Sequence, residues 1–104
     1  MKKLEIVVRE EKLESTIKAI RQIGVGGISV WKVQGQGAEE PPLVGDTYTR
    51  SMAIVIVEDE KVDPILKAVA DVACTETKGD GKVFVSNIEE VLDICSKECG
   101  HKVL

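Results

Sequence analysis

Residues 6–20 read IVVREEKLESTIKAI, and residues 55–69 read VIVEDEKVDPILKAV. The two segments share an aliphatic run, a charged Glu-Lys step, and then the pattern aliphatic-Lys-Ala-aliphatic at a constant offset. An internal repeat of this kind indicates that one supersecondary unit occurs twice in the chain. Each copy is typical of a strand that leads through a charged turn into an amphipathic helix, because apolar residues after the turn recur every three or four positions. These apolar helix residues are Leu13, Ile17, Ile20, Val62, Leu66 and Val69.

A further strand is expected after each helix. Gly24 can end the first helix in the left-handed conformation, and residues 28–34 then alternate with a period of two, as a half-buried strand does. After the second helix, residues 78–81 (KGDG) predict a tight turn into a strand at residues 82–86. The order βαββαβ predicts an α+β protein with the ferredoxin-like split fold. Residues 36–49, rich in Gly, Pro and acid, are expected to form a long loop between the halves.

Length and composition limit the function classes. The chain has 104 residues, 43% hydrophobic content, a net charge of −4, one histidine and three aromatic residues. This length predicts a single domain over residues 1–104, and a core this small favours an oligomer. The acidic balance and the few aromatics argue against nucleic-acid binding. Nucleophilic Ser/His/acid or Cys/His spacings are missing, so an enzyme is not expected. The apolar run at residues 6–8 is too short for a signal peptide or membrane helix, which predicts a cytoplasmic protein.

Three sequence motifs, taken in order, resemble the PII signal-transduction family over nearly the whole chain. They are the opening residues 1–5 (MKKLE), residues 27–37 (GISVWKVQGQG) and residues 79–85 (GDGKVFV). The resemblance implies a homotrimer with ligand sites between subunits, and a protein that regulates a partner rather than a catalyst. The partner would be the cytoplasmic side of a membrane transporter or a metabolic enzyme. The resemblance also implies a T-loop at residues 36–49, a B-loop at residues 74–82 and a C-terminal tail at residues 95–104.

An adenine nucleotide is the ligand that the resemblance implies. The glycines on both sides of Asp80 would let backbone N–H groups approach a phosphate, and Lys82 would add a compact positive charge. Taken alone, the same four residues would indicate only a hairpin turn. Ser29 and Ile56 match positions that line the adenine and ribose pocket in the family. The expected nucleotide-binding residues are Gly27, Ser29, Gly35, Gly37, Ile56, Gly79, Asp80, Gly81 and Lys82.

Departures from the family pattern change the expected ligand. Residues 38–40 (AEE) stand where the family has Arg-Gln-Lys, so repulsion by carboxylates argues against 2-oxoglutarate. Asp93 and Cys95 stand where the family has two phosphate-binding arginines. This loss of positive charge favours ADP or AMP over ATP. Arg50 matches the basic residue at the far end of the T-loop. The departures resemble divergent PII-like proteins linked to bicarbonate transport, and this resemblance implies Arg50 as the contact for bicarbonate or another small anion.

The tail holds two of the three cysteines, Cys95 and Cys99, together with the single histidine, His101. If the segment is helical, the two cysteines share a face and, with the histidine, could bind Zn²⁺ or Cu(I); alternatively the cysteines could form a reversible disulfide. The alternative function is therefore a metal- or redox-responsive trimer similar to CutA-like proteins. A third interpretation is a buried Cys95 beside exposed Cys99 and His101 on a frayed terminus. Cys74 is expected to pack as a small apolar side chain.

Overall fold

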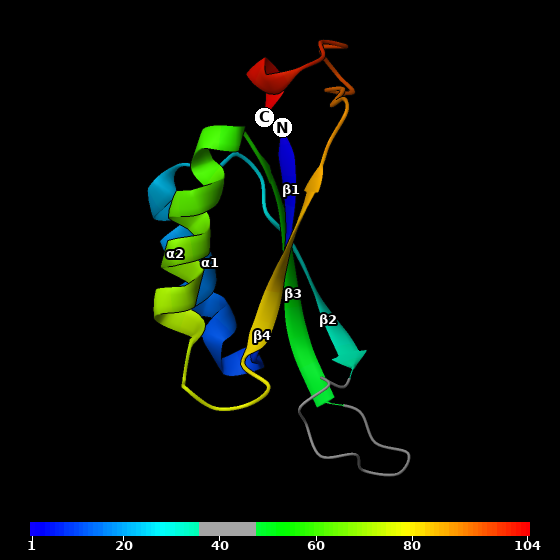
Figure 1. Ribbon diagram of the computed structural model, residues 1–104. Coiled ribbons are helices and arrows are strands. Elements are labelled where there is room, and N and C mark those ends of the chain that lie inside the picture. The colour runs from blue at the N-terminus through cyan, green and yellow to red at the C-terminus, as the bar shows by residue number, and fades with distance from the viewer. Residues whose placement is uncertain (36–47) are drawn as a thin grey trace.

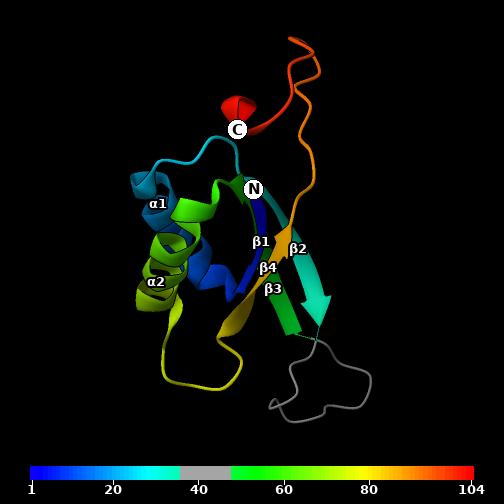
Figure 2. The same cartoon turned by 45° about the horizontal axis from the view of Figure 1, so that its top comes forward.

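The structure is a computed structural model that describes residues 1–35 and 48–104 (Figure 1). Within these ranges four strands form one antiparallel sheet in the order β2-β3-β1-β4. Two helices lie side by side on one face of the sheet (Figures 1 and 2). The predicted α+β ferredoxin-like fold is therefore confirmed. The elements are β1 Lys2–Val8, α1 Leu13–Ile23, β2 Ser29–Gly35, β3 Tyr48–Val57, α2 Val62–Ala73 and β4 Gly81–Asn87.

The two copies of the sequence repeat have the same backbone structure. β1 leads through a 3₁₀ turn, η1 (Glu10–Lys12), into α1, and β3 leads through η2 (Asp59–Lys61) into α2. Gly24 follows α1 with a φ of 92°, which is the predicted left-handed end of that helix. Pro64 lies in the first turn of α2, where its missing N–H breaks no helical hydrogen bond. In the described ranges, neither helix is long and apolar enough to cross a membrane.

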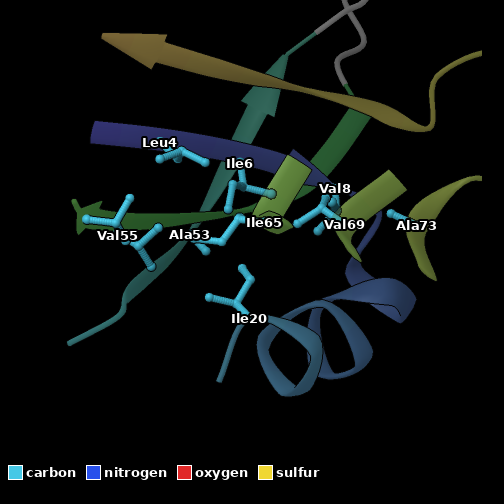
Figure 3. Packing of buried hydrophobic residues seen from close by; sticks show 10 residues of the cluster. Leu4, Ile6, Val8, Ile20, Ala53, Val55, Ile65, Val69 and Ala73 are labelled. Carbon is cyan, nitrogen blue, oxygen red and sulfur yellow. The ribbon is translucent and has the colours of Figure 1, made fainter. Parts of the chain in front are cut away.

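The core lies between the helices and one face of the two central strands. Alternate residues of β1 and β3 are buried, because successive side chains of a strand point to opposite faces. Ile20 of α1 and Ile65 and Val69 of α2 pack against these strand residues (Figure 3). The buried apolar residues are Leu4, Ile6, Val8, Ile20, Ala53, Val55, Val57, Ile65, Val69 and Ala73.

No helix of the described chain covers the opposite face of the sheet. The strand register places Trp31 beside Met52 on this open face. Two residues further along the strands, Glu5 of β1 lies between Ile54 of β3 and Phe84 of β4 on the same face. Trp31 is 44% exposed and Phe84 is 54% exposed. The prediction of a half-buried β2 is wrong for the single chain, because β2 is an edge strand and two helices cover mainly the central strands.

Residues 91–100 form a turn that we call the C-terminal hairpin. Leu92 pairs with Cys99 in an isolated antiparallel bridge, so the chain reverses direction between them. Lys97 has a φ of 62°, a left-handed conformation that a continuous right-handed helix does not contain. A further 3₁₀ turn, η3 (His101–Val103), follows the hairpin. The helical arrangement considered for this segment is therefore wrong.

Candidate functional site

The B-loop connects α2 to β4, and the side chain of Asp80 accepts hydrogen bonds from residues at the start of the same loop. The Thr75 N–H donates to Asp80 Oδ2 over 2.7 Å, and the Thr75 hydroxyl donates to Asp80 Oδ1 over 2.5 Å. Thr77 also donates to Oδ1, over 3.3 Å. The Thr75 hydroxyl and N–H, followed by Arg9 and Thr77, hold the pKa of Asp80 well below its usual range. The carboxylate therefore faces its own loop as an anion at neutral pH.

Two arginines bind the carbonyl groups of the B-loop. Arg9, directly after β1, donates from Nη2 to the Lys78 carbonyl over 2.7 Å and from Nε to Asp80 over 3.1 Å. Arg50 of β3 donates to the Gly79 carbonyl from both Nε, over 3.2 Å, and Nη2, over 3.0 Å. Hydrogen bonds from charged donors are stronger than neutral ones. Two consecutive peptide carbonyls of the loop are thus each held by a guanidinium group.

Gly81 marks the point where the B-loop enters the sheet. Its φ is 125°, and a Cβ at this position would lie 1.8 Å from the Val7 carbonyl oxygen. Only glycine avoids that collision and also adopts this φ at low cost. Lys82 follows on β4 opposite Val7, so the register aims it at the open face of the sheet, and it is exposed.

A family model described as Nitrogen regulatory protein P-II matches residues 1–98. The chain belongs to the P-II family. The resemblance found in the sequence is therefore confirmed, and this P-II chain is a member of a signal-transduction family. The matched range ends inside the C-terminal hairpin, before Cys99 and His101.

Similar proteins cover the P-II chain almost from end to end. Nitrogen regulatory protein P-II of Rhizobium meliloti is 32% identical over 108 residues, which span 96% of each chain. Nitrogen regulatory protein P-II 2 of Methanothermobacter thermautotrophicus is 30% identical over 112 residues, with 100% of this chain and 97% of that protein covered. Nitrogen fixation nifHD2 region GlnB-like protein 1 of Methanosarcina barkeri is 33% identical over 104 residues, with 96% and 99% covered.

The predicted nucleotide-binding residues lie at both ends of the P-II sheet. The B-loop residues 79–82 and Gly35 lie at the end where β1 finishes and β3 begins, since Gly81 pairs with Val8 and Gly35 with Tyr48. Ile56 lies near the other end, opposite Lys3. One chain therefore does not bring the whole set together. The remaining members, Gly27 before β2 and Ser29 at its start, lie toward the end with Ile56, and Gly37 lies outside the described residues.

Arg50, the expected anion contact, is engaged with protein carbonyls. Besides its two hydrogen bonds to Gly79, it donates from Nη1 to the Thr49 carbonyl over 3.0 Å.

Sequence reasoning missed Arg9 entirely. The repeat could have indicated it, because Arg9 and Glu58 occupy equivalent positions in the two copies, and a change of charge between otherwise similar copies marks a residue that differs in role. The T-loop prediction falls mostly on residues 36–47, which lie outside the described ranges.

The structure confirms the expected exposure of Cys99 and His101 but contradicts two other expectations about the cysteines. Cys74, Cys95 and Cys99 are all free and exposed, which corrects the prediction that Cys74 packs as an apolar residue and the interpretation of a buried Cys95. Within the described chain, no group of three His, Cys, Asp or Glu side chains is placed to hold a metal ion. The site of Cys95, Cys99 and His101 is thus not assembled in one subunit, because the hairpin replaces the helix that would have aligned them.

Proposed function

We propose that this P-II protein is a cytoplasmic homotrimer that binds an adenine nucleotide between subunits, with ADP or AMP preferred over ATP. The open face of the sheet supports the trimer, because apolar side chains such as Trp31 and Phe84 are more stable when another subunit covers them. The distribution of the candidate residues supports a shared site. B-loop residues of one subunit would face Ile56 and Ser29 of another, which a single chain holds apart.

The backbone of the B-loop is the observation that carries the nucleotide proposal. Gly79 has a φ of 84°, and its N–H and that of Asp80 have no backbone or side-chain acceptor among the described residues. Consecutive N–H groups around a left-handed residue form a concave site for anions such as phosphate. Lys82, two residues further on, supplies a cation that can bind a phosphate oxygen.

The preference for fewer phosphates follows from the charge of the C-terminal hairpin. Asp93 stands where the family has an arginine, and hydrogen bonds from the side chain and backbone N–H of Ser96 lower the pKa of Asp93. This carboxylate is therefore ionised at neutral pH. In the proposed shared site Asp93 would come from the subunit that also supplies Ile56, because both lie at the end of the sheet remote from the B-loop. An anion there would repel each added phosphate charge, so ATP is expected to lose more affinity than AMP.

Calorimetric titration of the reduced, metal-free protein with ATP, ADP and AMP tests this function. Saturable binding of ADP should weaken about tenfold in Lys82→Ala, as expected for a lost charge-assisted hydrogen bond. Lys67→Ala is the matched control, since this lysine is exposed on α2. No heat from any nucleotide, or equal ADP affinity in the two variants, would contradict the proposal.

The signal is proposed to pass through residues 36–49 to the cytoplasmic side of a membrane transporter or to a metabolic enzyme, by analogy with the family. The protein would regulate rather than catalyse, so chromatography should find ATP and ADP intact after long incubation with it. Bicarbonate is proposed as a co-effector at Arg50, where it would replace the contact of Nη1 with the Thr49 carbonyl and leave the two hydrogen bonds to Gly79 in place. Repeating the ADP titration with bicarbonate tests this, and an unchanged ADP affinity would remove bicarbonate from the proposal.

A redox response of the C-terminal hairpin is the second candidate function. Cys95 and Cys99 are both exposed thiols of one hairpin, where an oxidant can reach them. Oxidised glutathione would take two electrons and two protons from the thiol pair, so that one disulfide forms and two glutathione thiols are released. Mass spectrometry should show the loss of two hydrogens in the wild type and in Cys74→Ser, but not in Cys95→Ser. Glutathione adducts without an internal disulfide would contradict this function.

A further inference from the structure

The orientation of two peptide groups in the B-loop is fixed from outside the loop. In a trans peptide the C=O and the following N–H point in opposite directions, and the described chain has no cis peptide bond. Arg9 holds the Lys78 carbonyl, so the N–H of Gly79 points away from Arg9. Arg50 holds the Gly79 carbonyl, and the N–H of Asp80 points away from Arg50 for the same reason.

The side chain of Arg50 directs two of its nitrogens to the B-loop and one to its own strand. All three of its nitrogens, Nε, Nη1 and Nη2, donate to carbonyl oxygens of Gly79 or Thr49, at 3.0–3.2 Å. Arg9 likewise directs Nε and Nη2 to Asp80 and Lys78. A guanidinium group has a rigid planar fork, so contacts of this kind fix direction as well as distance.

We propose that Arg9 and Arg50 are positioning residues, which turn the N–H groups of Gly79 and Asp80 toward the phosphate of the nucleotide without touching it. The proposal deepens the nucleotide-binding function and rests on it. It gives Arg50 a role toward the nucleotide that differs from the small-anion contact that the sequence presented. Arg9 directly follows β1 and Arg50 lies near the start of β3, so the ends of the two central strands set the shape of the binding loop.

Arg50→Lys separates positioning from direct charge contact. Lysine keeps the positive charge but replaces two converging N–H donors on Gly79 by one mobile ammonium group. We expect affinity for ADP to fall about tenfold, while affinity for adenosine stays unchanged because adenosine has no phosphate. A residue that merely maintains the fold would change both affinities together. Arg21→Lys is the control, since Arg21 is exposed on α1.

Nuclear magnetic resonance of the ligand-free protein provides the second readout. The amide ¹H and ¹⁵N shifts of Gly79 and Asp80 should move in Arg50→Lys and in Arg9→Lys, and they should stay in place in Arg21→Lys. If Arg50→Lys does not fold, Arg9→Lys decides with the same two measurements. ADP affinity within twofold of the wild type would overturn the inference and leave the nucleotide function intact. Failure of the wild type to bind any nucleotide would overturn both.

Discussion

Substitution of Gly81 by alanine tests how the binding loop is joined to the sheet. Alanine at a φ of 125° costs about 1–3 kcal/mol of backbone strain. Its Cβ would also lie 1.8 Å from the Val7 carbonyl oxygen and 2.9 Å from the Val7 carbonyl carbon. Both atoms are backbone, so β4 has to move away from β1, and such overpacking costs about 1–3 kcal/mol. The free energy of unfolding should therefore fall by roughly 2–6 kcal/mol.

Urea unfolding at one fixed protein concentration measures this loss. Trp31 is the only tryptophan of the chain, so its fluorescence reports the transition without a label. With an m-value of about 2 kcal/mol/M, the midpoint should fall by about 1–3 M urea in Gly81→Ala. Gly35→Ala is the control, because no atom of the described residues lies within 4 Å of a Cβ there. Equal midpoints for the two alanine variants would refute the steric argument.

Three further predictions concern one charge, one core residue and one turn. Asp80→Asn should lower the free energy of unfolding at pH 7. This difference from the wild type should shrink below about pH 4, because the ionised carboxylate contributes its full stabilisation only above the pKa of an unfolded aspartate; a difference that grows in acid would contradict this. Ile20→Ala should lower the free energy of unfolding by about 2–5 kcal/mol, whereas Ile94→Ala, at a site 86% exposed, should change it little; equal urea midpoints would contradict the core assignment. Asp93→Ala removes the acceptor of the Ser96 N–H at 3.0 Å, so hydrogen exchange should speed up in the hairpin alone; unchanged exchange there would count against it.

The repeat predicted the order of strands and helices and most of the helix stripe that faces the core, but not which residue of α2 is most deeply buried. In α2 the predicted stripe contained Leu66, whereas Ile65 is the fully buried residue. Both are aliphatic neighbours, so periodicity cannot choose between them. The same ambiguity affects β2, where Val30 and Trp31 are apolar on opposite faces. Which of two neighbouring apolar residues is buried depends on how the helices cover the sheet. That coverage is a property of the assembled fold and not of the local sequence.

The site was predictable where one local motif specifies it. The glycines on both sides of Asp80 mark the B-loop in the sequence, because both adopt a positive φ that other residues rarely adopt. The contacts of Arg9 and Arg50 with this loop were not predictable, since they join residues far apart in the chain. In the tail, the spacing of Cys95 and Cys99 suggested a helix.

Asp93, two residues before Cys95, is a better indicator of the backbone structure of the tail. Asp93 accepts a hydrogen bond from the N–H of Ser96, which is a local turn contact that an aspartate often makes. The left-handed Lys97 follows directly and completes the reversal of the chain. Cysteine spacing carries no information about backbone direction, whereas a turn-forming aspartate does.

The strand order has a consequence for the origin of the chain. In the described structure β1 pairs with β3 and β4, and β2 pairs with β3, so no strand pairs with another strand of its own repeat. A lone repeat would leave the edges of both its strands open, and such edges attract other chains. An ancestor made of one repeat would have had to interlace with a second copy before any sheet existed. A duplication of that unit would join two molecules that already needed each other to form a sheet, and a chain cut between the repeats should yield halves that fold only on meeting.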